Sequence, residues 1–184
     1  MNADFLMIQR MKQGDEASFD AFVRKYYGEI LNYCHYRCFD RNYAEDLAQE
    51  TFLHFFAKLS DYHDRGKTKN YLYTIAGNLC RDFYRKKKDI PAEHEDLEQS
   101  AVSAPMDRVL DQIVVEEAIK SLPPEFAEVI ILYYFQDLKM REIADVLQVK
   151  LSLVKYRLKR AKKILEQRMG EEDAYESQRA TYDL

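Results

Sequence analysis

The chain has 184 residues, of which 47% are apolar and 33% charged, so it can form a folded core and is not a globally disordered chain. Only five glycines and four prolines are present, which argues against turn-rich β-sandwiches, barrels and dinucleotide-binding folds. The formal net charge of −4 would, taken alone, argue against a nucleic-acid partner.

The net charge conceals an uneven distribution along the chain. Residues 65–88 carry a net charge of +7 and residues 141–169 a net charge of +6. Residues 89–117, which lie between these blocks, carry a net charge of −8. Two strongly basic blocks in acidic surroundings indicate a polyanionic partner.

The first half of the chain is predicted to form a small all-α domain over residues 1–88. A helix of about 20 residues begins after Asp15, a candidate N-cap. A second helix is expected over about 42–59, followed by a polar loop over 60–69 and a third helix over about 70–87. The apolar stripe of the first helix comprises Phe19, Phe22, Val23, Tyr26, Ile30, Leu31 and Cys34.

The second half is predicted to form another small all-α domain over residues 105–169. Residues 89–104 are acidic and polar and have no helical stripe, so we expect them to form a flexible linker. An apolar stripe follows over 106–118, and a double proline is expected to open a helix over about 124–136. The acidic tail 170–184 is expected to be frayed.

The second domain is predicted to end in a helix-turn-helix. Helices over about 140–147 and 152–168 are joined by a short turn, and Ser152 is a candidate N-cap of the later one. The expected packing joins Ile143, Ala144 and Leu147 to Val154, Leu158 and Ala161.

The last predicted helix is strongly basic outside its apolar side. Such a helix can enter a DNA major groove, with its first turns at base edges and its later cations at phosphates. The alternative is the solvated face of an ordinary basic helix. The side chains concerned are Lys155, Tyr156, Arg157, Lys159, Arg160, Lys162 and Lys163.

The first basic block differs because tyrosines alternate with its cations. Tyr71, Tyr73 and Tyr84 are candidates to stack on unpaired bases. Arg81 and the cations of 85–88 would then hold the nucleic-acid backbone, as in single-strand binding grooves. The alternative is that these tyrosines are half-buried residues of a structural helix.

A third surface is expected on the helix over 42–59. Asp46, Gln49 and Glu50 have i, i+3, i+4 spacing and therefore share one exposed face. An acidic and amide patch suits docking onto a basic partner helix, and the alternative is a solvated face.

The three cysteines are too few for a disulfide framework. Cys34, His35 and Cys38 have the spacing of half a zinc site, but they fall inside a helical stripe and have no second ligand pair. We therefore expect no metal and no cofactor. No nucleophile–base pair is evident, so the chain is predicted not to be an enzyme. A signal peptide and an apolar span are both absent from the sequence, which predicts a cytoplasmic protein.

Several motifs, taken in order, resemble those of bacterial RNA polymerase sigma factors of the extracytoplasmic-function (ECF) branch. Asp46-Leu-Ala-Gln-Glu-Thr-Phe52 resembles the motif that binds core polymerase. The stretch over 71–85 resembles the promoter-melting and minus-ten motif. The stretches over 122–132, 142–147 and 154–158 resemble the minus-thirty-five-binding domain. This branch retains only the sigma domains called 2 and 4, which would be residues 1–88 and 105–169 here.

The resemblance implies core RNA polymerase and promoter DNA as partners, and an anti-sigma factor that covers the same surfaces, with no membrane insertion of this chain. The loop over 60–69 would receive a flipped base of the melted minus-ten element. The implied core-binding residues are Asp46, Leu47, Gln49 and Glu50. The implied minus-ten residues are Tyr71, Asn78, Arg81, Arg85 and Lys86. The implied minus-thirty-five residues are Lys155, Tyr156, Arg157, Lys159 and Arg160.

The chain departs from the family pattern at several positions. Tyr71 stands where Trp is usual, Gly77 replaces a larger residue, and Gln148 replaces the usual turn glycine. Leu153 and Tyr156 replace common Thr and Ser on the recognition helix, so the promoter sequence cannot be carried over from the family.

Two other classes compete with a sigma factor. A stand-alone helix-turn-helix regulator with an N-terminal interaction domain would act without the patch on 42–59. A protein-only interaction module would need neither basic block.

Overall fold

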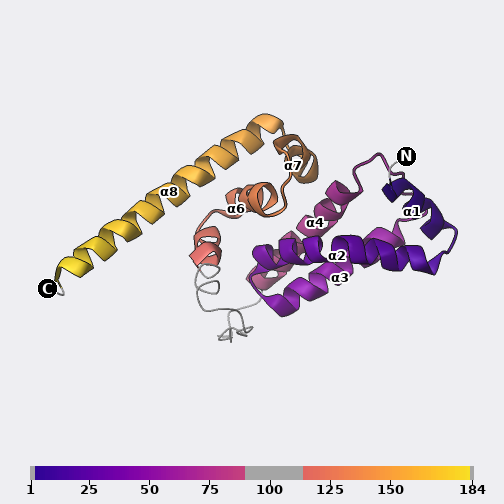
Figure 1. Cartoon of the computed structure of the whole chain (residues 1–184), viewed down its shortest axis with the longest axis horizontal. Coiled ribbons are helices and arrows are strands. Elements are labelled where there is room, and N and C mark those ends of the chain that lie inside the picture. The colour runs from indigo at the N-terminus through magenta and orange to yellow at the C-terminus, as the bar shows by residue number, and fades with distance from the viewer. Residues whose placement is uncertain (1–2, 90–113, 183–184) are drawn as a thin grey trace. The chain divides into compact units, whose positions relative to one another are not determined.

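The structure, a computed structural model, describes residues 3–89 and 114–182, of which 87–89 and 169–182 are described by their backbone alone. The regular elements of these ranges are all helical, as predicted (Figure 1). The chain forms two compact units, one mainly of residues 1–103 and the other mainly of residues 104–184. The predicted linker 89–104 lies, apart from Asp89, outside the described residues, so its flexibility and the domain boundaries stay predictions.

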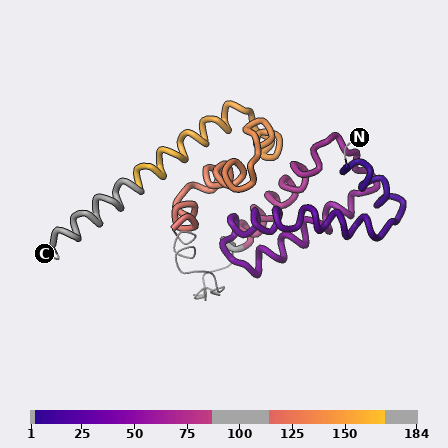
Figure 2. The backbone as a smooth tube through the Cα atoms, viewed as in Figure 1, coloured from indigo at the N-terminus to yellow at the C-terminus, as the bar shows by residue number. Residues whose placement is uncertain are grey.

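The first unit consists of four helices in the described range. They are α1 (Ala3–Lys12), α2 (Glu16–Cys38), α3 (Arg41–Ala57) and α4 (Thr68–Asp89). Helices α2, α3 and α4 pack on one another, and α1 packs on α2 (Figures 1 and 2). The three predicted helices are therefore confirmed, with bounds that differ by a few residues.

The core of the first unit is a cluster of aromatic rings. Phe22 of α2 stacks on Phe55 of α3 with ring centroids 4.8 Å apart and an interplanar angle of 13°. The edge of Phe52 meets the ring of Phe22 at 6.2 Å. Phe22 and Phe55 are fully buried. This cluster confirms the predicted apolar side of α2, on which Tyr26, Ile30 and Cys34 are also buried.

Helix α1 was not predicted from the sequence. Its residues Ile8 and Met11 are buried, and Asp4 accepts a hydrogen bond from the Tyr26 hydroxyl at 2.7 Å. The helix ends at Lys12, and Gly14 in the turn that follows has a φ of +84°, which glycine adopts at little cost. The Asp15 N–H donates to the Arg10 carbonyl across this turn. Two features of the sequence could have predicted this helix: the glycine that follows it and the three-residue spacing of Ile8 and Met11.

Asp15 precedes α2, as predicted, in an extended backbone conformation. Its carboxylate makes no capping bond to the backbone; it accepts a hydrogen bond from the Ser18 hydroxyl. At the start of α3, by contrast, the Asp40 carboxylate accepts from the Tyr43 N–H at 3.1 Å.

The three cysteines are free thiols. Cys34 of α2 and Cys80 of α4 are fully buried, and the hydrogen bond between their thiols, together with burial, raises the pKa of Cys34 far above its usual range. Burial raises the pKa of Cys38 to about 12. Cys34 and Cys38 are thus protonated thiols, and the buried pair of Cys34 and Cys80 joins α2 to α4.

The second unit begins, within the described range, with helical residues 114–120. It continues with α6 (Pro124–Ile130), the π-helical turn η1 (Ile131–Phe135), α7 (Met140–Leu147) and α8 (Leu151–Tyr182). Helix α6 packs on α8. Pro124 occupies the first position of α6, as predicted, because its missing N–H would be unpaired there in any case.

Two predictions for the second unit were wrong. The tail expected to be frayed continues α8 to Tyr182, since its Glu, Gln, Arg and Ala residues favour helix and no proline interrupts them. Residues 106–113 of the predicted 106–118 stripe lie outside the described residues, and at its described end Val114 is exposed. The buried positions lie further along the chain, at Ile119 and Leu122.

The aromatic core leads to a stability prediction. Phe22→Ala leaves a cavity beside Phe55 and is expected to lower the free energy of unfolding by about 3–5 kcal/mol. Phe5→Ala is the control because Phe5 is partly exposed on α1, and its cost should stay below about 1 kcal/mol. Urea denaturation followed by circular dichroism measures both, and equal costs would contradict the assigned core.

Candidate polymerase and nucleic-acid interfaces

The surface of α3 carries the predicted acidic patch. Asp46, Gln49 and Glu50 are exposed on one face, as their spacing predicted. Leu47 does not belong to this surface, because it is only 7% exposed and is part of the core of the first unit. A residue adjacent to Asp46 in sequence points about 100° around the helix, and here that direction is inward.

Leu53 extends the acidic patch and was not singled out in the sequence. It is 67% exposed and follows Glu50 by three positions on α3. Its exposure could have been predicted from the sequence, because Leu53 lies outside the inward-facing stripe of Phe52 and Phe55. The His54 Nε2 lies 3.5 Å from the Glu50 carboxylate. The face therefore combines carboxylates, an amide and one exposed leucine.

Helix α4 presents the predicted minus-ten residues. Tyr71, Asn78 and Arg85 are spaced by seven residues and thus share one face. The Arg81 guanidinium donates to the Asn78 side-chain oxygen, and its Nε donates to the Gly77 carbonyl at 3.1 Å. These two bonds hold Arg81 along the helix beside Asn78.

Toward its C-terminal end, α4 remains exposed and basic. Arg85 forms an ion pair with Asp82 at 3.1 Å, and both side chains face solvent. Lys86 is exposed. Exposed pairs of this kind contribute little to stability, so Arg85 can exchange its partner for a phosphate.

Two of the three tyrosines expected to stack on bases are unsuited to it. Tyr73 is fully buried, with its ring edge-on to Tyr33 at 5.3 Å, and burial raises its pKa well above the usual range. Tyr84 donates a hydrogen bond to the Arg37 carbonyl, and burial raises its pKa to about 12. Only Tyr71 keeps the predicted location, since residue 73 points to the opposite side of the helix.

Tyr71 is half-buried and belongs to a group of aromatic rings at the start of α4. The ring of Tyr62 stacks on it with centroids 5.2 Å apart and an interplanar angle of 14°. Phe55 lies 6.1 Å from Tyr71 and 5.1 Å from Tyr62. Tyr62 comes from the predicted loop 60–69, of which Thr68 and Lys69 already belong to α4. The loop and the candidate stacking residue are therefore in contact.

Helix α8 places its cations as predicted. Val154, Leu158 and Ala161 are buried on one side, Arg157 is half-buried, and the exposed predicted residues are Lys155, Tyr156, Lys159 and Arg160. Tyr156 is 58% exposed, and its ring meets Phe126 of α6 edge-on at 6.4 Å.

The N-cap predicted at Ser152 was wrong. Helix α8 begins at Leu151, so Ser152 lies inside the first turn. The Lys150 carbonyl accepts the first helical bonds, from the N–H groups of Leu153 and Val154. The capping position is thus two residues earlier than expected, and a lysine occupies it.

The turn before α8 contains an unfavourable backbone conformation. Gln148 has a φ of +55°, in the left-handed region that glycine adopts most readily. The Val149 N–H donates to the Ala144 carbonyl at 3.0 Å across this turn. The position therefore has the geometry that glycine would satisfy, although glutamine stands there.

Lys162 makes a contact that the sequence did not indicate. Its Nζ lies 5.2 Å from the ring centroid of Tyr134 of η1. A hydrogen bond with the Tyr134 hydroxyl raises the pKa of Lys162. The π-helical turn thus holds one cation of α8, whereas Lys155, Lys159 and Arg160 face outward.

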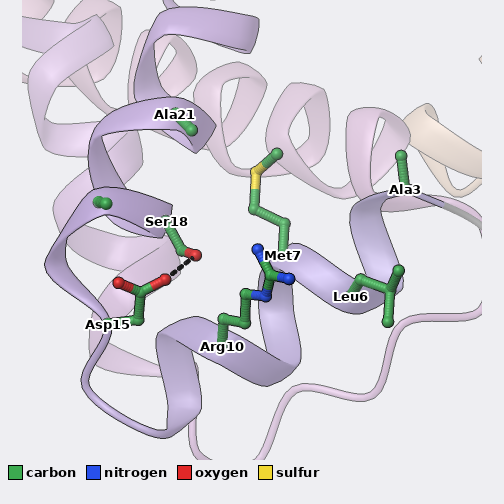
Figure 3. Close-up of a pocket in the computed structure, with 8 residues that line it drawn as sticks. Ala3, Leu6, Met7, Arg10, Asp15, Ser18 and Ala21 are labelled. Carbon is green, nitrogen blue, oxygen red and sulfur yellow. Dashed lines mark hydrogen bonds between the residues drawn. The ribbon is translucent and has the colours of Figure 1, made fainter.

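A hollow of about 340 Å³ lies between α1 and the start of α2, lined by residues that include Leu6, Met7, Arg10 and Ser18 (Figure 3). It holds none of the predicted site residues. Within residues 3–89 and 114–182, no group of three His, Cys, Asp or Glu side chains could hold a metal ion. No helix in the described parts of the chain is long and apolar enough to span a membrane.

Two family models match the chain in the order of the two units. Sigma-70 region 2 matches residues 22–90, and Sigma-70 region 4 matches residues 112–165. The sigma factor YlaC of Bacillus subtilis is 31% identical over 166 residues, which cover 86% of this chain and 95% of YlaC. The ECF sigma factor SigW of the same organism is 28% identical over 176 residues, which cover 88% and 94%.

Solved structures support the fold. CnrH, solved in complex with the cytosolic domain of CnrY, is 20% identical with a TM-score of 0.75, and the match covers 92% of this chain and 99% of that one. The sigma factor RpoE of Bartonella quintana, solved with the anti-sigma factor NepR, is 22% identical with a TM-score of 0.69, and the match covers 81% and 94%.

These matches define the chain as an RNA polymerase sigma factor, a transcription initiation factor that binds core polymerase and directs it to promoters. Within that class it belongs to the ECF branch. The family assignment argues against a stand-alone regulator and a protein-only interaction module.

The strained turn gives a prediction for the second unit. Gln148→Gly should raise the free energy of unfolding by up to about 1 kcal/mol, because it relieves the left-handed conformation by more than it adds to unfolded-chain entropy. Gln148→Ala is the matched control and should give no gain. Thermal unfolding of both variants measures the difference, and a destabilised glycine variant would contradict the assignment.

Proposed function

We propose that the two units divide promoter recognition by the state of the DNA. The second unit reads the minus-thirty-five element as a duplex, and the first unit captures the minus-ten element as a separated strand. The main support for this proposal is that the exposed cations of the two units lie in different structural surroundings. Those of α8 lie on a helix-turn-helix, whereas those of α4 accompany stacked aromatic rings.

For the first unit, Tyr71 would stack on a base of the melted strand, and the loop 60–69 would receive a flipped base. Asn78 and Arg81 would contact the strand along α4, with Arg85 and Lys86 on its phosphates. A stacked base contributes about 1–3 kcal/mol, so capture of the open strands shifts the melting equilibrium toward them. The chain itself carries no chemical step.

For the second unit, the exposed start of α8 would enter the major groove. Lys155, Tyr156 and Arg160 would face base edges, while Arg157 and Lys159 would contact the backbone. Helix-turn-helix proteins present the N-terminal residues of the second helix in this way. The contact between Tyr156 and Phe126 supports the proposal, because it orients the tyrosine before DNA binds.

For core polymerase, the docking surface would be the acidic face of α3, formed by Asp46, Gln49 and Glu50. Their side chains are exposed and match the spacing of the family's core-binding motif. We propose basic helices of the largest polymerase subunit as the partner and the cytoplasm as the place of action. Leu47, as a core residue, would support this face from beneath.

An anti-sigma factor is a further proposed partner. The similar structures of CnrH and RpoE were solved with CnrY and with the anti-sigma factor NepR, respectively. A protein that covers the α3 face or the basic helices would block polymerase or DNA. Affinity purification of the chain from its own cells, with cross-linking, tests this; recovery of polymerase alone under all growth conditions would contradict it.

Mapping transcript starts tests the proposed function as a whole. Core polymerase with and without this protein transcribes sheared genomic DNA from the source cell, and the transcript 5′ ends are sequenced. We expect protein-dependent starts that share two sequence elements upstream. Identical starts in both reactions would contradict the proposal.

The core-docking surface predicts the effect of charge reversal. Asp46→Arg and Glu50→Lys should each weaken binding to core polymerase by about tenfold or more, because they place a cation against the proposed basic partner. Asp20→Arg makes the same reversal on an exposed part of α2 and should leave affinity unchanged. Equilibrium binding of labelled protein to core polymerase measures all three, and equal affinities would remove the assignment.

The recognition helix predicts a DNA effect. Arg160→Ala in the holoenzyme should weaken binding to a minus-thirty-five duplex by about fivefold to tenfold, because it removes a side chain that is proposed to face base edges. Arg24→Ala, which removes an exposed charge from α2, is the control. Unchanged affinity of the Arg160 variant across salt concentrations would contradict the proposed role of α8.

A further inference from the structure

The segment that joins α3 to α4 is tied to α1 by a single lysine. The Lys12 Nζ donates to the carbonyl of Ser60 at 2.9 Å and to the carbonyl of Tyr62 at 2.7 Å. Lys12 is in the last turn of α1 and outside the residues matched by the region 2 model, which begin at residue 22. A cation that bonds two main-chain carbonyls fixes the path of this backbone.

The same segment is tied to α4 by a side-chain network. The buried Thr68 hydroxyl donates to the Asp64 carboxylate at 3.0 Å, and the Gly66 N–H donates to the same oxygen at 2.8 Å. Because the one hydroxyl proton of Thr68 is used in this bond, Tyr62 is the donor in its own 3.1 Å bond to Thr68. Burial raises the pKa of Tyr62, which keeps that proton in place.

The aromatic contacts complete the connection. Tyr62 stacks on Tyr71 and meets the fully buried Phe55 edge-on. Its backbone carbonyl is held by Lys12, its hydroxyl by Thr68 and its ring by the core. The loop is therefore bonded from both sides in the free protein, and its position relative to Tyr71 is set before DNA arrives.

We propose that Lys12 and Tyr62 are positioning residues for the choice of the minus-ten base. Lys12 holds the backbone of 60–62, and Tyr62 holds the face of Tyr71 beside it. This inference rests on the proposed function, which assigns base capture to this loop. A loop that is held in one position cannot rearrange to accommodate a different base, whereas a mobile loop can, so the held loop discriminates more sharply between bases.

The test uses holoenzyme assembled from core polymerase and the full chain. The probe is the single-stranded non-template minus-ten segment of a promoter mapped by transcript sequencing, with every single-base variant. The measured quantity is the ratio of dissociation constants between the native and the substituted base. Binding to a minus-thirty-five duplex and to core polymerase is measured in parallel.

Lys12→Met keeps the length of the side chain and removes both bonds to the loop, and Tyr62→Leu removes the stacked ring. Each substitution should lower the ratio of dissociation constants between substituted and native base by roughly fivefold to tenfold at one position of the minus-ten segment. Binding to the duplex and to core polymerase should be unchanged. Lys12→Arg should restore most of the ratio. Arg10→Met is the matched control, because it removes an exposed cation from the same helix.

Each outcome decides between the claims. If wild-type holoenzyme has no base preference on the single strand, the proposed function fails. If wild type discriminates and both Lys12→Met and Tyr62→Leu discriminate equally well, the positioning role is overturned while the proposed function stands. Equal losses on strand, duplex and core would also overturn it, since they indicate a general structural defect. Tyr62→Phe, which keeps the ring, should retain more of the ratio than Tyr62→Leu.

Discussion

The first unit depends on the ring of Phe55, which joins its core to its surface. On the inner side Phe55 stacks on Phe22, and on the outer side it contacts Tyr62 and Tyr71. Because packed interiors transmit small displacements, the position of the surface rings follows from the packing of α2 and α3. Tyr71 of α4, the candidate base-stacking residue, thereby packs against the core formed by α2 and α3, and the adjoining loop is held by Lys12 of α1.

The net charge of −4 is compatible with the two proposed DNA-binding surfaces because charge is segregated by element. The basic side chains of α4 and α8 lie outside buried apolar stripes, and the exposed carboxylates of α3 occupy a different face. Under the proposed function, the electrostatic fields of these segregated charges would attract DNA to the basic helices and polymerase to the acidic face of α3. Family membership defines which partners these are, and the proposed roles follow from where each surface lies.

Helical periodicity predicted the all-α fold, the long helices of the first unit, the α6 start and the α7–α8 pair. It could not locate α1, whose buried contacts are only Ile8 and Met11, or the helical tail, which has no apolar stripe. For the site, spacing placed Asp46, Gln49 and Glu50 correctly on one face. Tyr73 was misplaced because its residue type, a tyrosine among cations, suggested exposure where packing buries it, and Leu47 was misplaced because the family motif was carried over whole. The bonds from Lys12 join residues 48 and 50 positions apart, a separation at which local patterns carry no signal.

Separate units of the chain are proposed to bind separate states of the promoter. Tyr71→Ala and Tyr156→Ala, each in the holoenzyme, are compared for their dissociation constants on a single-stranded minus-ten segment and on a minus-thirty-five duplex. We expect Tyr71→Ala to weaken only strand binding and Tyr156→Ala to weaken only duplex binding. Equal weakening of both ligands by both variants would contradict it.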